Sequence, residues 1–270
     1  VFLGSERGIY KWSADNRQWT MVSDADAAPA FGEAGGPLRS QGLVLPYEYG
    51  DDPERRNDPV LETVFAYNAS GVYRSDDDAR TWRAVELPDS VQQVNGLAVS
   101  NGWPADPVIM VAVAAPGVVA VISLDNGQTW REVPGTGGIV GMDVEMSIDF
   151  APIPDPDEDW LTTLHLPVSA KGVPLGPPPT MVPPYIGSRE AFIGADGAGV
   201  LYTDDGGVTW NASPPTYRAV NVTALDMLPG GREAIVFAGS LQSGLFRSDD
   251  GGQTWHWTEA GPPRGTGQAI

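Results

Sequence analysis

The residues in this chain that could bind a cation or transfer a proton are mostly carboxylates. Asp155, Asp157 and Asp159 alternate along a proline-rich stretch, and alternating carboxylates suit a hard cation such as calcium. The glycine and the glutamate that complete an EF-hand loop are missing from this stretch. We therefore expect no metal and no other cofactor, and calcium at these three residues is kept as the alternative.

Acid–base catalysis would need titratable groups held on both sides of a substrate. Neighbouring acids occur at Asp51-Asp52 and at 157–159, but nothing in the sequence sets a pair across a cleft at glycosidase spacing. The two histidines, His165 and His256, lie far apart in the sequence, and each is expected to be packed or exposed. No catalytic residue is assigned, which favours a protein without enzymatic activity over an enzyme.

The strongest pattern is a repeated octapeptide, S-x-D-x-G-x-T-W. Complete copies span 123–130 and 248–255; the copy at 203–210 begins with Thr, the copy at 75–82 has Ala79 at position five, and a worn copy at 13–19 is one residue short. The Asp can accept backbone N–H groups inside a tight turn, the Gly supplies left-handed backbone, and the Trp is predicted to open the next strand. The aspartates and tryptophans are Asp77, Trp82, Asp125, Trp130, Asp205, Trp210, Asp250 and Trp255.

This octapeptide resembles the Asp-box, or BNR repeat. The resemblance implies an all-β β-propeller, in which each box joins the third and fourth strands of a four-stranded blade. It also implies that the boxes are elements of the fold, remote from any active site. We therefore interpret the box aspartates and tryptophans as structural residues rather than as metal ligands or acid–base groups.

The spacing of the boxes predicts where the strands lie. The steps from Trp82 to Trp130, Trp210 and Trp255 are 48, 80 and 45 residues, so one repeat takes about 45–48 residues and the longer step contains an insertion. The predicted strands are 1–4, 9–13 and 19–22; 41–45, 62–67, 71–75 and 81–86; 94–100, 108–114, 118–123 and 129–133; 140–148, 190–195, 200–203 and 209–212; and 221–228, 234–239, 244–248 and 254–258.

The first repeat lacks its first strand, and residues 266–270 stand where another first strand is due. We predict that this carboxyl-terminal segment completes the first blade and closes a ring of five four-stranded blades, without open sheet edges. Residues 1–270 would then be a single propeller domain. The alternative is a piece of a larger propeller, of about six to eight blades.

Long insertions fall between the first and second strands of the repeats, at about 46–61 and 150–189. All such loops lie on the box face of a propeller, since successive strands alternate in direction. The longer insertion is rich in Pro, which favours extended structure, and long loops of this kind are often functional. We expect these loops to bind a partner, although an insertion that packs on its own disc stays open. The expected aromatic anchors are Tyr47, Tyr49, Trp103, Trp160 and Tyr185.

The composition restricts the class of partner. The formal net charge is −19, which disfavours nucleic acid and anionic membrane surfaces and suits a soluble protein or a cationic partner. The chain has no cysteine, and its most apolar run, 108–122, is broken by Pro116-Gly117 and is too short to span a bilayer as a helix. Because Val1 begins inside a strand pattern, we expect a chain that has been processed or trimmed. We expect an exported protein, extracellular, periplasmic or on the cell surface.

Several families resemble the chain through the Asp-box. Sialidases need an arginine triad, but their F-R-I-P signature is absent; Arg39, Arg218 and Arg264 precede predicted first strands and could face the channel. Xyloglucan-cleaving glycosidases place two aspartates between two propellers, and this chain has the length of one. Sortilin-type receptors and photosystem II assembly factors use the propeller as a binding platform. We expect a non-enzymatic scaffold for a protein or glycan, with a glycoside hydrolase and an assembly or surface-structure subunit as alternatives.

Overall fold

The computed structural model describes residues 1–5, 7–13, 15–23, 40–46, 62–100, 107–135, 139–146, 190–204, 206–213, 221–228, 235–240 and 243–258. These residues form five antiparallel sheets and no helix, which confirms the predicted all-β class. Sheet A consists of β1 (Phe2–Ser5), β2 (Gly8–Ser13) and β3 (Gln18–Met21). Sheet B consists of β4 (Gly42–Val44), β5 (Val64–Asn68), β6 (Gly71–Ser75) and β7 (Arg83–Val85).

The other three sheets also have four strands each. Sheet C consists of β8 (Gln93–Val99), β9 (Ile109–Ala115), β10 (Val118–Ser123) and β11 (Arg131–Pro134). Sheet D consists of β12 (Val140–Met146), β13 (Ala191–Asp196), β14 (Gly199–Thr203) and β15 (Asn211–Ala212). Sheet E consists of β16 (Val222–Leu228), β17 (Ile235–Ser240), β18 (Gly244–Ser248) and β19 (His256–Trp257).

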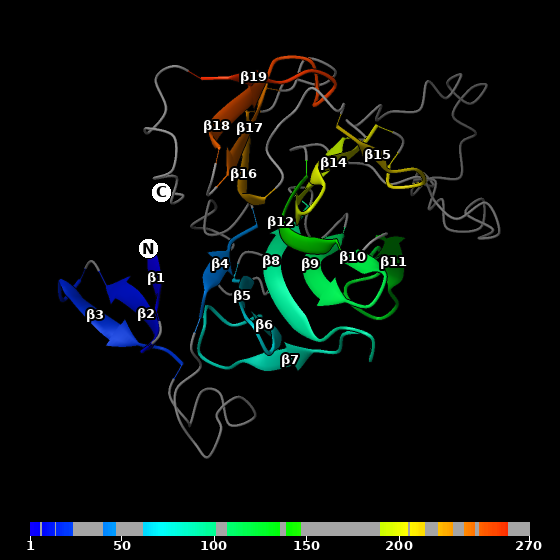
Figure 1. Ribbon diagram of the computed structural model, residues 1–270. Helices are drawn as coiled ribbons and strands as arrows, with labels where there is room; N and C mark the ends of the chain where they lie inside the picture. The colour runs from blue at the N-terminus through cyan, green and yellow to red at the C-terminus, as the bar shows by residue number, and fades with distance from the viewer. Residues whose placement is uncertain are drawn as a thin grey trace, which may run out of the picture.

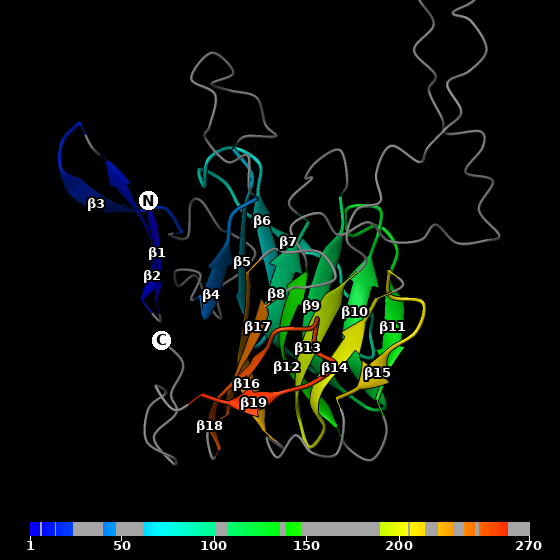
Figure 2. The same cartoon turned by 90° about the horizontal axis from the view of Figure 1, so that it is seen from above.

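The five sheets follow one another around a common centre (Figure 1). The strands of each sheet pair in chain order, and the first strand β12 contacts both β8 and β16, the first strands of the sheets on either side of it. Seen from the second direction, the strands of sheets B, C and D run along a shared axis (Figure 2). Five sheets in this order fit five blades. The segment expected to close the ring, 266–270, lies outside the described residues.

Hydrophobic side chains are buried between successive sheets rather than in one central core. The clusters lie between sheets A and B around Ile9 and Val64, between B and C around Phe65 and Val111, between C and D around Met110 and Ile193, and between D and E around Phe192 and Val236. Each cluster also contains the box tryptophan of its later sheet, in the order Trp82, Trp130, Trp210 and Trp255. Sheets B, C and D are therefore each held by the sheet before and the sheet after, and among the described residues sheets A and E each pack on one neighbour.

The strands lie within two residues of their predicted bounds where both are described, but one part of the prediction is wrong. In sheets B to E the fourth strand begins one residue after the box Trp, so the Trp does not open it; β11, for example, starts at Arg131. The reason is that the Thr before each Trp still belongs to the loop: Thr129 donates its N–H to Asp125 Oδ1 at 2.8 Å.

The worn box at 13–19 does not form an Asp-box loop. Ser13 pairs with Gln18 and Trp12 with Trp19, so β2 and β3 form a hairpin that stays paired up to Ser13 and Gln18. Arg17 takes the positive φ, at 52°. Because this copy is one residue short, β2 and β3 stay paired up to the turn. A complete box, by contrast, separates the two strands that it connects.

Candidate functional site

The box loops of sheets B to E share one backbone conformation. Positions four and five have positive φ in every copy: 61° and 67° at Asp78 and Ala79, 66° and 83° at Asn126 and Gly127, 80° and 88° at Gly206 and Gly207, and 65° and 83° at Gly251 and Gly252. Two successive left-handed residues turn the chain sharply, and glycine adopts this conformation at the least cost. Ala79 shows that the loop forms with a side chain at position five as well.

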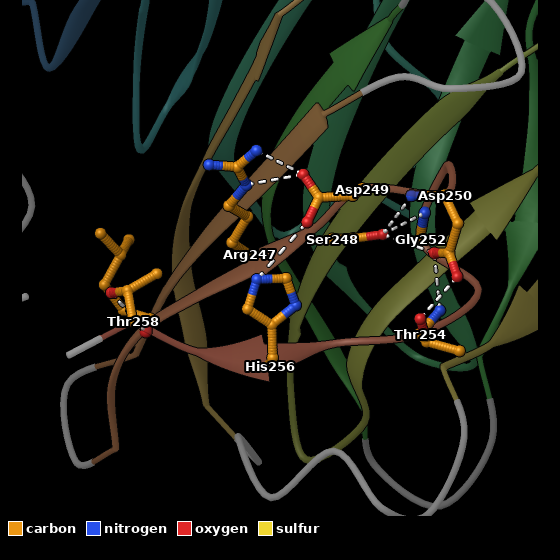
Figure 3. A network of polar contacts seen from close by, with 9 residues as sticks. Arg247, Ser248, Asp249, Asp250, Gly252, Thr254, His256 and Thr258 are labelled. Atoms are coloured by element: carbon orange, nitrogen blue, oxygen red, sulfur yellow. Dashed lines mark hydrogen bonds and ion pairs between the residues drawn. The ribbon is translucent and has the colours of Figure 1, made fainter.

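Hydrogen bonds inside each loop hold this turn, as Figure 3 shows for sheet E. Ser248 Oγ accepts the Gly252 N–H at 2.8 Å and donates to Asp250 Oδ1 at 2.8 Å. Thr254 donates its N–H to Asp250 Oδ1 at 2.8 Å and its hydroxyl to Oδ2 at 2.5 Å. The same four bonds, of 2.6–2.9 Å, surround Asp77 in sheet B and Asp125 in sheet C.

The box carboxylates are held in their ionised form by their own loops. Desolvation raises the pKa of Asp125, but hydrogen bonds from Thr129, Ser123 and Gln128 lower it by more, so its pKa lies below the ordinary value. The pKa values of Asp77 and Asp250 are lowered by the same balance of causes. Because a general acid must release a proton near the working pH, this geometry favours a turn-forming role for the three aspartates. Asp205 lies outside the described residues.

The box tryptophans connect each sheet to the one before it. Three indole N–H groups donate to residues that follow the last strand of the preceding sheet: Trp82 to Val22 O at 2.8 Å, Trp130 to Glu86 O at 2.8 Å, and Trp255 to Ser213 Oγ at 3.1 Å. Within the part of the chain that is described, the buried Trp210 indole N–H has no acceptor. The boxes thus position whole sheets, and any ligand site depends on the surfaces that those sheets present.

Asp143 is a buried carboxylate that the sequence reasoning missed. It lies on the inner strand β12, where its oxygens accept the Val144 N–H at 3.0 Å and the Leu225 N–H of β16 at 2.9 Å. Burial raises the pKa of Asp143 to about 6, against the lowering effect of these two bonds. A Cβ at Gly96 on β8 would come within 2.9 Å of Asp143 Oδ1. This carboxylate therefore lies where the three inner strands β8, β12 and β16 approach one another. Its signal in the sequence is an acid inside the apolar run 139–144.

One described cavity opens between sheets B and C on the face opposite the box loops. Its volume is about 680 Å³, and its wall includes the turn at 69–71 and the connection from β7 to β8. Apolar side chains and neutral polar groups line it, with Asp89 as the one acid of the described wall: Ala69, Ser70, Val72, Tyr73, Ala84, Val85, Leu87, Pro88, Asp89, Val91, Gln92, Gln93 and Val94, with Gly71. Sequence patterns gave no sign of it, because it depends on how two sheets diverge.

A second described cavity, of about 570 Å³, lies between the same two sheets on the box side. Arg74 and Arg83 line it together with Glu86, Asn126 and Gln128. Arg74 hydrogen-bonds to Asn126 of the next box, and its Nε lies 2.5 Å from Asp76 Oδ1; Arg83 Nη2 lies 2.7 Å from Asp76 Oδ2. Both arginines of this cavity are therefore paired with the same neighbouring carboxylate, Asp76.

Most of the sequence-predicted contact residues lie outside the described residues, so the structure does not bring them together. These residues are Tyr47, Tyr49, Trp103, Trp160 and Tyr185, the possible calcium ligands Asp155, Asp157 and Asp159, and Arg39, Arg218, Arg264 and His165. His256 is described and exposed, with Nε2 3.5 Å from Asp249 Oδ2 (Figure 3).

No three His, Cys, Asp or Glu side chains of the described ranges are grouped in a way that could hold a metal ion. The described parts of the chain also contain no helix with the length and apolar character needed to cross a membrane.

The comparisons with known proteins agree with the loops and the sheets. The BNR/Asp-box repeat family matches residues 201–212 and 246–256. A comparison with curated proteins gives no match. Among solved structures, an ancestral GH74 enzyme has a TM-score of 0.60 at 13% identity, over 98% of this chain and 30% of that one.

Two further similar structures are proteins called YCF48. YCF48 bound to a D1 peptide has a TM-score of 0.50 at 14% identity, over 94% of this chain and 62% of that one. YCF48 from Cyanidioschyzon merolae has a TM-score of 0.49 at 9% identity, over 97% and 68%. Such low identities concern the fold, and this chain spans about 30% of the length of the GH74 enzyme. The loops, the radial sheets, the BNR/Asp-box match and the likeness to the GH74 enzyme identify a chain that carries BNR/Asp-box repeats on a fold of the β-propeller type.

Proposed function

We propose that this chain is an exported binding scaffold that holds a protein partner and has no catalytic activity of its own. The observation that carries the proposal is the cavity between sheets B and C, whose wall mixes apolar side chains with neutral polar groups. Ser70, Gln92 and Gln93 add hydrogen-bonding groups to that wall. A concave surface that offers both apolar contacts and hydrogen-bonding groups suits an extended peptide segment of a partner.

The charge of the cavity supports binding rather than bond cleavage. Asp89 is the one acid of the described wall, which contains no Arg, Lys or His. Hydrolysis of a glycoside needs two carboxyl groups on opposite sides of the bond that breaks. The YCF48 structure with a D1 peptide is a case in which a protein of similar fold binds a peptide. That case supports a protein partner for this chain. We favour a protein partner over a glycan.

The insertions at 46–61 and 150–189 are proposed as a second contact region on the opposite face. Their aromatic residues Tyr47, Tyr49, Trp160 and Tyr185, with Trp103 from a shorter loop, would serve as anchors because aromatic residues dominate binding hot spots. Deleting 152–184 should leave the described sheets folded, as measured by circular dichroism, and abolish capture of the native partner. If the deletion variant still captures the partner, the insertion does not contribute to binding.

The cavity can be tested with random peptides displayed on phage and selected against the full chain. We expect selected peptides to bind the wild type, and Val91→Asp to weaken binding at least about tenfold because a charge enters the apolar wall. Leu45→Asp is the matched control, because Leu45 is 41% exposed and does not line this cavity. Equal binding by the two variants, or no selected binder at all, would reject the cavity as the site.

The glycoside hydrolase alternative has one observation in its favour, the raised pKa of Asp143, about 6, which is in the range of a general acid. Against it, both oxygens of this carboxylate accept backbone N–H groups. The scaffold proposal expects no hydrolysis in a screen with chromogenic glycosides. Hydrolysis that Asp143→Asn abolishes in a folded variant would replace the scaffold with an enzyme.

A further inference from the structure

The connection from β7 to β8 carries the one charged residue of the described wall of the cavity between sheets B and C. This residue is Asp89, and it is exposed. Among the described residues, no hydrogen bond or ion pair involves the Asp89 carboxylate. Every other residue of the described wall is uncharged. A ligand that enters this cavity therefore meets a single fixed kind of charge, and that charge is negative.

The position of Asp89 is set by the turn that contains it. The Val91 N–H donates to Pro88 O at 3.0 Å and closes a four-residue turn whose second residue is Asp89. Ser90 Oγ donates to Glu132 Oε1 of β11 at 2.7 Å, which attaches the turn to sheet C. Val91 also packs on the apolar cluster between sheets B and C. Because the turn is already ordered, a ligand does not have to order it on binding.

A connection of this kind does not need an acid in order to form. The corresponding connection from sheet C to sheet D, residues 135–139, contains three glycines and no charged residue. Both connections lead from the last strand of one sheet to the first strand of the next. The fold therefore does not account for Asp89, and a role in recognition does.

The surroundings of Asp89 favour a cationic group. The described wall contains no Arg, Lys or His that would neutralise this carboxylate. Glu132, which accepts the Ser90 hydroxyl, adds a second carboxylate beside the turn. The formal net charge of −19 attracts cations to the whole molecule and repels anions. A segment with a basic residue is therefore favoured over an acidic one at this rim.

Apolar side chains lie on both sides of this carboxylate. Leu87 and Val91, two residues before and two residues after Asp89, line the cavity and are half-buried. In an extended peptide, residues two apart point to the same side and lie about 7 Å from each other. The long stem of a Lys or Arg can lie on an apolar residue while its charge stays in water. An apolar side chain in the cavity thus brings a basic residue two positions away to the rim.

We propose that the cavity selects an extended segment of a protein partner in which a Lys or Arg stands two residues from an apolar residue. The apolar side chain enters the cavity beside Leu87 and Val91, and the basic side chain pairs with Asp89. The inference rests on the proposed function, since it concerns the same cavity, and it adds the sequence pattern that the partner must carry.

Parallel selections from a random peptide library on phage test the pattern. The full-length wild type should enrich peptides with a Lys or Arg two residues from an apolar residue, and Asp89→Asn should not. Asp15→Asn is the matched control, because Asp15 is exposed, does not line the cavity, and its replacement changes the net charge by the same amount. This control should select the same pattern as the wild type.

A double-mutant cycle on one selected peptide measures the pair. Asp89→Asn should bind the peptide about threefold more weakly than the wild type, the size of effect typical of an exposed ion pair. Replacing the basic residue of the peptide by glutamine should cost the same factor, and the two changes together should cost no more than either alone. Titration calorimetry at low ionic strength measures the affinities, and circular dichroism checks that the variants are folded.

The outcomes separate this inference from the proposed function. Peptides that need the cavity, as shown by their loss with Val91→Asp, but that bind Asp89→Asn as well as the wild type would overturn the inference and leave the proposed function standing. A preference for basic residues that Asp15→Asn also removes would come from the net charge and would likewise overturn the assignment to Asp89. If the wild type selects no peptide at all, the proposed function fails and the inference fails with it.

Discussion

The box loops of sheets B and E make the same hydrogen bonds but pack on different residues beneath them. In sheet B position five is Ala79, fully buried with φ 67°. In sheet E it is Gly252 with φ 83°, where a Cβ would come 2.8 Å from Phe192 Cε1. The comparison separates two requirements. The Asp and the Ser or Thr of the box set the shape of the loop, and the sheet beneath the loop decides which residue is tolerated at position five.

The largest effect is expected for Gly252→Ala. The new methyl group meets Phe192 and forces a left-handed alanine, so we expect the free energy of unfolding to fall by about 3 kcal/mol. Chemical denaturation monitored by tryptophan fluorescence measures this change. Gly207→Ala is the control, since its nearest described neighbour would be 3.5 Å away, at Ile122 Cδ1, and only backbone strain is added. Equal losses in the two variants would contradict the role of the underlying sheet.

Asp250→Ala should have the next largest effect. The substitution leaves the Thr254 N–H and hydroxyl and the Ser248 hydroxyl without their acceptor, which we expect to cost about 2 kcal/mol at pH 7. Asp77→Ala in sheet B should cost a similar amount because its bonds are the same. Costs that differ by more than about twofold would mean that the loops are not equivalent.

The effect of Asp250→Ala should depend on pH in one direction. The pKa of Asp250 is lowered in the folded state, because the hydrogen bonds of the loop outweigh desolvation. The unfolded chain then binds protons more readily, so the contribution of this carboxylate is complete above its unfolded pKa and is lost as pH falls through the folded one. The difference in stability between wild type and variant should therefore shrink on acidification from pH 7 to about 3. A constant difference would show that the ionised form is not what the loop binds.

Trp130→Phe tests the connection between sheets. The variant loses the indole bond to Glu86 O, and we expect a destabilisation of about 1 kcal/mol beyond the loss of packing. Trp210→Phe supplies the control for packing, because the described residues offer no acceptor to that indole. If the two variants lose the same stability in thermal and chemical unfolding, the indole bond contributes nothing.

The smallest effect is expected for Ala79→Gly. Relief of the left-handed alanine and loss of a buried methyl group oppose each other, so stability should change by less than about 1 kcal/mol. A loss of more than that would mean that packing, rather than backbone conformation, dominates at position five of sheet B. The measurement is the same denaturation experiment used for Gly252→Ala.

The repeated elements could be predicted from the sequence because each depends on local residues. Asp, Gly and Thr at fixed positions define the box wherever it occurs, and the spacing of Trp82 and Trp130 predicts four strands between boxes. The two strands beside the worn box are also predicted, but the pairing of Ser13 with Gln18 is not, because one absent residue changes which strand positions can pair. Asp143 and the cavity beside Val91 could not be foreseen, since each depends on how separate sheets approach one another.

The clusters that join only successive sheets have a consequence for the history of such proteins. Trp82 and Trp130 each hydrogen-bond to the repeat that precedes their own sheet. Duplicating one unit of about 45 residues therefore inserts a blade that already carries the tryptophan that attaches it to the blade before. No distant contact has to be redesigned when the copy appears. Genes of this kind can thus lengthen or shorten in whole blades, and selection can then act on the loops of each new copy separately.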